Sequence, residues 1–189
     1  EFGWLSSVAY WTDGNLCRMN MQRYTYWRKI KSFETELINA QYASFVSLYV
    51  NSTVISELGL PIAAFCIWGD DWEWTRRISK EHLCFVVPKS KVLHKAANNG
   101  NGNIAIEDEA RIWRYQYSFR NDVYIAGQEG ASGYLHLLLK TGYNTLRIIF
   151  QADHSRLRKL KTMYGSLARG FFFHPPIEYI DEGECIRSE

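Results

Sequence analysis

Residues 60–77 read LPIAAFCIWGDDWEWTRR, and we interpret the rest of the chain as support for this stretch. An apolar run leads into three acids that stand among three tryptophans: Asp70, Asp71, Glu73, Trp68, Trp72 and Trp74. Carboxylates prefer water and indole rings prefer to leave it, so this mixture indicates the mouth of a pocket. We expect a strand over 64–68 that delivers the acids to its end. We expect a helix to follow, beginning at Asp70 or Asp71.

The composition predicts a globular chain that is long enough for one compact domain. Hydrophobic residues make up 47% of the 189 residues, which excludes a disordered chain. The formal net charge of +2 is too small to argue for a nucleic-acid partner. No apolar run approaches the roughly 20 residues needed to cross a bilayer. Cys66 and Cys84 lie in apolar runs, which is typical of buried thiols in a reducing cytosol. The chain opens on a strand-like pattern at Phe2, and we expect an upstream part to be missing.

The rest of the sequence predicts strands and short helices first, and helices alone later. We expect strands at 3–11, 33–42, 84–87 and 91–94, and helices at 45–58, 72–80, 104–127, 134–152 and 155–168. Gly59 is the predicted C-cap of the helix at 45–58. This order indicates part of an α/β domain over 1–104, a helical region over 105–175 and a flexible tail over 176–189.

Two segments are rich in basic residues. Residues 19–31 interleave basic and aromatic side chains, which fits either phosphate or membrane binding or an ordinary exposed loop. The helix at 155–168 is amphipathic, with an apolar stripe bordered by basic residues at Arg156, Arg158, Lys159 and Lys161. This helix could bind anionic lipids, or it could pack onto the domain.

The acids allow two interpretations. Asp-x-x-Glu at a helix start is a variant of the capping box, in which acids satisfy free backbone amides. One Asp would suffice for a cap, however, and this helix begins with two, Asp70 and Asp71. A carboxylate at a strand end could instead act as a general base on a substrate hydroxyl, while its partner holds Mg²⁺ or Mn²⁺ or fixes the orientation of the base. His94 ends a predicted strand and is a candidate ligand if it faces the acids, although a lone His more often has a structural role. Arg120 could bind a phosphate or a carboxylate, or pair with a neighbouring acid.

Residues 59–78, GLPIAAFCIWGDDWEWTRRI, closely resemble the acceptor-side motif of family 2 glycosyltransferases with the GT-A fold. The nearest branch in appearance contains bacterial galactofuranosyl- and rhamnosyltransferase-like enzymes. In that family Gly-Leu-Pro ends a helix, a hydrophobic strand follows, and a Trp-Gly-Asp-Asp turn precedes a Glu, an aromatic residue and an Arg. The segments 43–45 (ASF), 92–94 (VLH) and 115–121 (YQYSFRN) are also family-like. The resemblance spans most of residues 1–175.

The resemblance implies roles for the matching residues. Asp71 would be the catalytic base that activates the acceptor hydroxyl, and His94 would complete a divalent metal site. The acceptor pocket would be formed by Asp70, Glu73, Trp68 and Trp72. The implied reaction is a single inverting displacement at the anomeric carbon of a UDP- or dTDP-linked sugar. Mg²⁺ or Mn²⁺ would stabilise the leaving diphosphate.

The sequence departs from the family pattern in two places. It contains no Asp-x-Asp motif, and Ser47 stands where relatives often have Gly. We therefore expect a fragment, the acceptor half of a GT-A domain followed by C-terminal helices, that lacks the nucleotide-binding half and is inactive alone. The enzyme would extend a cell-surface polysaccharide or a lipid-linked glycan at the cytoplasmic face of the membrane, touching it peripherally through 155–173. Two alternatives remain open: a non-catalytic carbohydrate-binding or scaffold domain, and a metal-dependent hydrolase.

Overall fold

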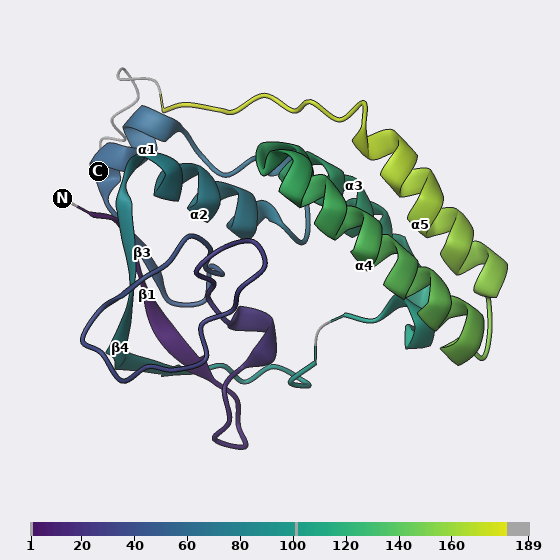
Figure 1. Ribbon diagram of the computed structural model, residues 1–189, viewed down its shortest axis with the longest axis horizontal. Coiled ribbons are helices and arrows are strands. Elements are labelled where there is room, and N and C mark those ends of the chain that lie inside the picture. Colours follow the sequence, from purple (N-terminus) through teal and green to yellow (C-terminus); the bar gives the residue numbers. More distant parts are fainter. Residues whose placement is uncertain (1, 101, 181–189) are drawn as a thin grey trace, which may run out of the picture. The chain divides into compact units, whose positions relative to one another are not determined.

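The computed structural model describes residues 2–100 and 102–180, which form two compact units (Figure 1). The first unit contains residues 2–62, 71–97 and 175–180, and the second contains 63–70 and 98–174. Over the described residues the chain is mixed α/β, with a four-stranded mixed sheet and five α-helices. The predicted α/β class is confirmed at this level. Of the tail predicted to be flexible, residues 181–189 lie outside the described residues.

The sheet of the first unit is built around two long parallel strands. β1 (Phe2–Tyr10) pairs with β4 (Leu83–Leu93) at the centre. The short strands β2 (Ile38–Asn39) and β3 (Leu48–Val50) pair antiparallel at the edges, in the order β2-β4-β1-β3. β1 is buried along most of its length, as a central strand requires. The strand predicted at 3–11 is therefore confirmed.

β4 runs through a proline at which the sequence predicted a break. Ser7 pairs with Val87, but the next residue of β1, Val8, pairs with Lys91. Residues 88–90 therefore bulge out of the ladder. Pro88 lacks an amide hydrogen, and a bulge is a place where a strand tolerates that loss. The prediction of two separate strands at 84–87 and 91–94 was wrong for this reason.

The segment 45–58 is helical only in its second half. Ser47 has a φ of 54°, in the left-handed region that favours glycine, and β3 follows directly. α1 (Ser52–Leu58) begins after Asn51, whose side chain accepts a hydrogen bond from an amide of the first turn. It ends at Gly59 with a φ of 78°, which confirms the predicted C-cap. The longer predicted helix was wrong because its first residues complete the sheet.

α2 (Asp70–Glu81) packs on the sheet and closes the core of the first unit. It begins at Asp70, as predicted. Trp74 and Ile78 of α2 are buried in one cluster with residues of β1 and β4. The indole Nε1 of Trp4 donates a hydrogen bond to the Thr75 carbonyl over 2.9 Å, which ties β1 to the helix. Figure 1 shows α2 beside these strands.

The second unit is helical. Two 3₁₀ turns, Ile104–Ile106 and Glu109–Arg114, precede α3 (Tyr115–Gln128), which is the helix predicted within 104–127. α4 (Gly130–Gln151) and α5 (Arg156–Gly170) confirm the other two predicted helices (Figure 1). α3 and α4 approach closely at Gly133, where a Cβ atom would collide with the carbonyl of Ala126. No helix of the described residues is long and apolar enough to cross a membrane.

One basic residue of α5 is not on the surface. Lys159 is fully buried, and its Nζ donates to the carbonyl oxygen of Ala105 over 2.8 Å. Lys159 therefore packs inside the second unit, and its long side chain reaches a backbone carbonyl there. Arg156, Arg158 and Lys161 are exposed.

Candidate active site at the start of α2

The turn that leads to the acids is not the predicted strand. Residues 63–65 form a 3₁₀ turn, and three of the next four residues are left-handed: Cys66 (φ 63°), Trp68 (φ 62°) and Gly69 (φ 93°). A strand requires strongly negative φ values, so the strand prediction at 64–68 was wrong. Cys66 is also exposed rather than buried, because the turn carries it outward.

Within the second unit, Asn121 holds this turn. The side chain of Asn121 is buried on α3, and its Nδ2 donates to the carbonyls of Phe65 (3.0 Å) and Trp68 (2.8 Å). Arg120 donates to the Ala64 carbonyl and to the side-chain oxygen of Asn121. Non-glycine residues with positive φ cost of order 1 kcal/mol each, and they persist where surrounding contacts hold them. Arg120 is thus engaged with the turn instead of with the acid that the sequence offered as its partner.

The predicted site residues fall into both units. Trp68 and Asp70 belong to the second unit, and the other four belong to the first. Trp68 is half-buried against Tyr115, with 5.0 Å between ring centroids, and the guanidinium of Arg114 lies 5.1 Å from its ring. These contacts fix the indole ring. Whether it stacks on a sugar stays a prediction.

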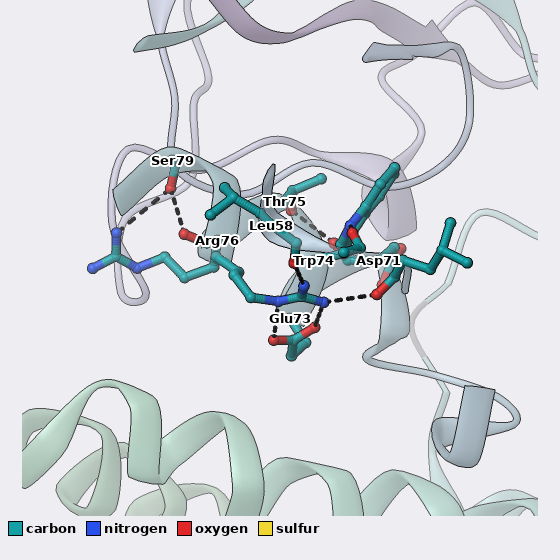
Figure 2. Close-up of polar contacts among 10 residues, drawn as sticks. Leu58, Asp71, Glu73, Trp74, Thr75, Arg76 and Ser79 are labelled. Atoms are coloured by element: carbon teal, nitrogen blue, oxygen red, sulfur yellow. Dashed lines mark hydrogen bonds and ion pairs between the residues drawn. The ribbon is translucent and has the colours of Figure 1, made fainter. Parts of the chain in front are cut away.

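Glu73 is held in a buried ion pair. Its Oε1 and Oε2 accept from Nε and Nη2 of Arg77, each over 2.9 Å, and Glu73 is 5% exposed. Arg77 also donates to the carbonyls of Leu58 and Leu60, which fastens the loop after α1 to α2. Figure 2 shows these bonds around Glu73 and Leu58. Because both oxygens point to Arg77, Glu73 does not reach back to the helix start as a capping box would require.

Asp71 lies in the first turn of α2 and is half-buried. Its Oδ1 accepts from the backbone amide of Trp72 over 2.8 Å. Its carbonyl accepts from Oγ1 of Thr75 over 2.7 Å (Figure 2). The same Oγ1 lies 3.2 Å from both the amide and the carbonyl of Ala43, so Thr75 joins this turn to residue 43. The N-terminal end of a helix stabilises a charged carboxylate, which suits a base that is ionised before reaction.

His94 follows β4 and belongs to a connected set of polar side chains. Its Nδ1 lies 2.7 Å from Oδ1 of Asn20, and Nδ2 of Asn20 donates to Oγ of Ser44 over 2.9 Å. An amide oxygen accepts, so Nδ1 carries the proton and Nε2 is the nitrogen able to accept a proton or bind a cation. Ser44 adjoins Ala43, which is bound to the start of α2. Hydrogen bonds and one peptide unit thus connect His94 with the turn of Asp71.

The described residues do not form a metal site by themselves. No group of three or more His, Cys, Asp or Glu side chains among them is arranged to hold a metal ion. Mg²⁺ and Mn²⁺ prefer several oxygen ligands, whereas His94 offers one ring nitrogen.

Trp72 lies in a cluster of aromatic rings in the first unit. Its ring centroid is 5.6 Å from that of Tyr42 and 6.3 Å from that of Tyr26. The guanidinium of Arg23 lies 4.3 Å from the centroid of Trp72, and burial lowers the pKa of this guanidinium from its ordinary value. At least one basic residue of the segment 19–31 is therefore used for packing inside the protein.

The comparisons with known proteins give no relative. No protein-family model, no curated protein and no solved structure matches the chain. The likeness to family 2 glycosyltransferases rests on the residues quoted above.

Proposed function

We propose that the chain provides the acceptor side of an inverting glycosyltransferase, with Asp71 as the general base. The observation that supports this most is the position of Asp71, in the first turn of α2 and linked to His94 through Thr75, the 43–44 segment and Asn20. A half-buried carboxylate at a helix start, in the first unit with a histidine, combines a charged base with a second titratable group.

In the proposed reaction the carboxylate of Asp71 takes the proton from an acceptor hydroxyl. The hydroxyl oxygen forms a bond with the anomeric carbon of the donor, and the bond from that carbon to the nucleoside diphosphate breaks on the opposite side. The configuration at the anomeric carbon is inverted, and the proton ends on Asp71. The donor is a UDP- or dTDP-linked sugar and the acceptor is a glycan or a lipid-linked glycan. A bound Mg²⁺ or Mn²⁺ would supply charge for the leaving diphosphate.

The other residues divide into two groups in this proposal. Trp72, in the same unit as Asp71, contacts the acceptor. The acceptor contacts expected for Trp68 and Asp70 stay predictions. Glu73 acts as a positioning residue, because its carboxylate holds Arg77 and through it the loop before the acidic turn. His94 orients the 43–44 segment through Asn20 and Ser44.

The test is Asp71→Asn in the protein that contains this chain, assayed with a panel of UDP- and dTDP-sugars and glycan acceptors. General-base catalysis typically contributes about 10²–10⁴-fold, so kcat should fall by that factor while the melting temperature is retained. Asp13→Asn is the matched control, because Asp13 lies in an exposed turn where it binds Asn15. Unchanged turnover in Asp71→Asn would refute the role of Asp71.

A carbohydrate-binding domain without catalysis is the second candidate, favoured by the two half-buried tryptophans, Trp68 and Trp72. It predicts sugar binding by the wild-type protein without transfer from any donor. In that case Asp71→Asn would leave the dissociation constant unchanged, and calorimetric titration with glycans would measure it.

A further inference from the structure

α4 presents an apolar face to the surface along its whole length. Its members are 44–77% exposed and recur at helical spacing: Leu135, Leu138, Leu139, Leu146, Ile149 and Phe150. The opposite side of the helix, with Leu137, Asn144 and Ile148, is buried in the second unit. At 1.5 Å per residue this 22-residue helix is about 33 Å long. Exposed apolar surface this continuous marks an interaction site.

The face continues onto α5. Oη of Tyr164 lies 2.8 Å from Oγ1 of Thr145, so the exposed side of α5 adjoins α4 there. Leu157 is 83% exposed, and it lies on the same side of α5 as Tyr164 and Lys161, at helical spacing. Phe172 follows α5 and is 86% exposed. The two helices together form what we call the α4–α5 surface.

Basic residues greatly outnumber acidic residues in the segment that contains α4 and α5. Between Gly130 and Ile177 the sequence has one acid, Asp153, against basic residues at 140, 147, 156, 158, 159, 161 and 169. Two of these are engaged internally, because Lys140 pairs with Asp122 and Lys159 is buried. The remaining basic residues, at 147, 156, 158, 161 and 169, place positive charge at the edges of the apolar face.

We propose that the α4–α5 surface docks on a bilayer that contains anionic lipids. A second copy of the chain would bring one basic surface against another, since a two-fold interface pairs a patch with itself. An anionic bilayer complements both parts: the leucines and aromatics enter the boundary of the acyl chains, and the Lys and Arg heads meet lipid phosphates. α4 then lies along the interface, while its opposite side, with Leu137, Asn144 and Ile148, stays buried in the second unit. This proposal does not depend on the role of Asp71.

The experiment is co-sedimentation of the full chain with phosphatidylcholine vesicles, with and without phosphatidylglycerol. Binding should require phosphatidylglycerol. It should weaken as salt rises from about 0.1 to about 1 M, where the Debye length falls from about 10 to about 3 Å. Failure to bind phosphatidylglycerol vesicles at low salt would overturn the proposal.

Two pairs of substitutions test the surface. Leu139→Glu with Leu146→Glu should lower the vesicle partition coefficient by about tenfold per leucine, because each loses a buried apolar side chain. Leu37→Glu with Leu83→Glu is the control, since these exposed leucines of the first unit should leave binding unchanged.

The second test pair reverses charge. Arg158→Glu with Lys161→Glu should lower vesicle binding by about fivefold or more per residue. This pair lies on α5, so it still tests the surface if the glutamates on α4 impair folding. Equal binding by this pair, or by a folded α4 variant, would overturn the proposal. Sedimentation equilibrium tests the alternative occupant, a second copy of the chain. If the wild-type protein is a dimer that does not bind vesicles, and the α4 variant is a monomer, the surface is assigned to a second copy instead.

Discussion

The buried pair of Glu73 and Arg77 allows a stability prediction with an internal control. A second ion pair, Lys89 with Glu36, has the same 2.9 Å separation, but its side chains are 78% and 86% exposed. In the buried pair the corresponding values are 14% for Arg77 and 4% for Glu73. The two pairs therefore differ mainly in their access to water.

Arg77→Ala should lower the free energy of unfolding of the first unit by about 3–5 kcal/mol, because it leaves the carboxylate of Glu73 buried and unpaired. It also removes the donors to the carbonyls of Leu58 and Leu60, so the loop after α1 loses its attachment. Lys89→Ala should cost less than about 1 kcal/mol, since water and salt screen an exposed pair.

Urea denaturation followed by tryptophan fluorescence measures both variants, because Trp4 and Trp74 lie in the core of the first unit. We expect a large fall in the transition midpoint for Arg77→Ala and almost none for Lys89→Ala. Equal midpoints for the two variants would show that burial of the Glu73 pair does not control stability, and the reasoning would then be wrong.

Four further predictions concern the Cys84 thiol and two helical glycines. Burial raises the pKa of the Cys84 thiol to about 12. At pH 8 Cys84 should therefore resist a thiol-specific reagent that labels the exposed Cys66, and peptide mapping by mass spectrometry would measure the labelling. Equal labelling rates for the two cysteines would contradict the burial of Cys84. The same raised pKa means that its contribution to stability is full below the unfolded value near 9 and is lost as pH rises toward 12, a loss that Cys84→Ala should reduce. Gly142→Ala should raise the melting temperature, because helical alanine is favoured by up to about 1 kcal/mol and a Cβ there meets no atom within 4 Å. Gly133→Ala should lower it through a clash with the backbone of α3, and a rise for Gly133→Ala would contradict the close approach of the two helices.

Long periodic segments could be predicted from the sequence, and short apolar ones could not. α4 and α5 show helical spacing over several turns, so their place in the chain was clear. The run at 64–68 has no period, and its left-handed turn depends on Asn121, more than fifty residues later. The path of β4 past Pro88 depends on a bulge, which is set by its pairing with β1 and is invisible in β4 alone.

The local features of the candidate site could be predicted from the sequence, as with the fold, and its long-range contacts could not. The start of α2 at the acids followed from local sequence. The pairing of Glu73 with Arg77 also fits the four-residue spacing of helical ion pairs, although we predicted that Glu73 binds the acceptor. The connection from His94 through Asn20 and Ser44 joins residues far apart in the chain, and no sequence spacing encodes such side-chain hydrogen bonds. The chemical roles of Asp71 and His94 stay predictions.

The interleaving of the two units has a consequence for the order of events during synthesis. Phe2 pairs with Leu83, so β1 is synthesised about 80 residues before β4. The β1–β4 pairing therefore cannot form until β4 has been made. α3 and α4 are joined by a single residue, Glu129, and can associate as soon as both are made. The strap at 175–180 then returns to the first unit, where the amide of Leu60 donates to the carbonyl of Glu178 over 2.8 Å. All strands of the sheet are therefore synthesised before α3, α4 and α5, but the first unit is completed only after the helical unit has been synthesised.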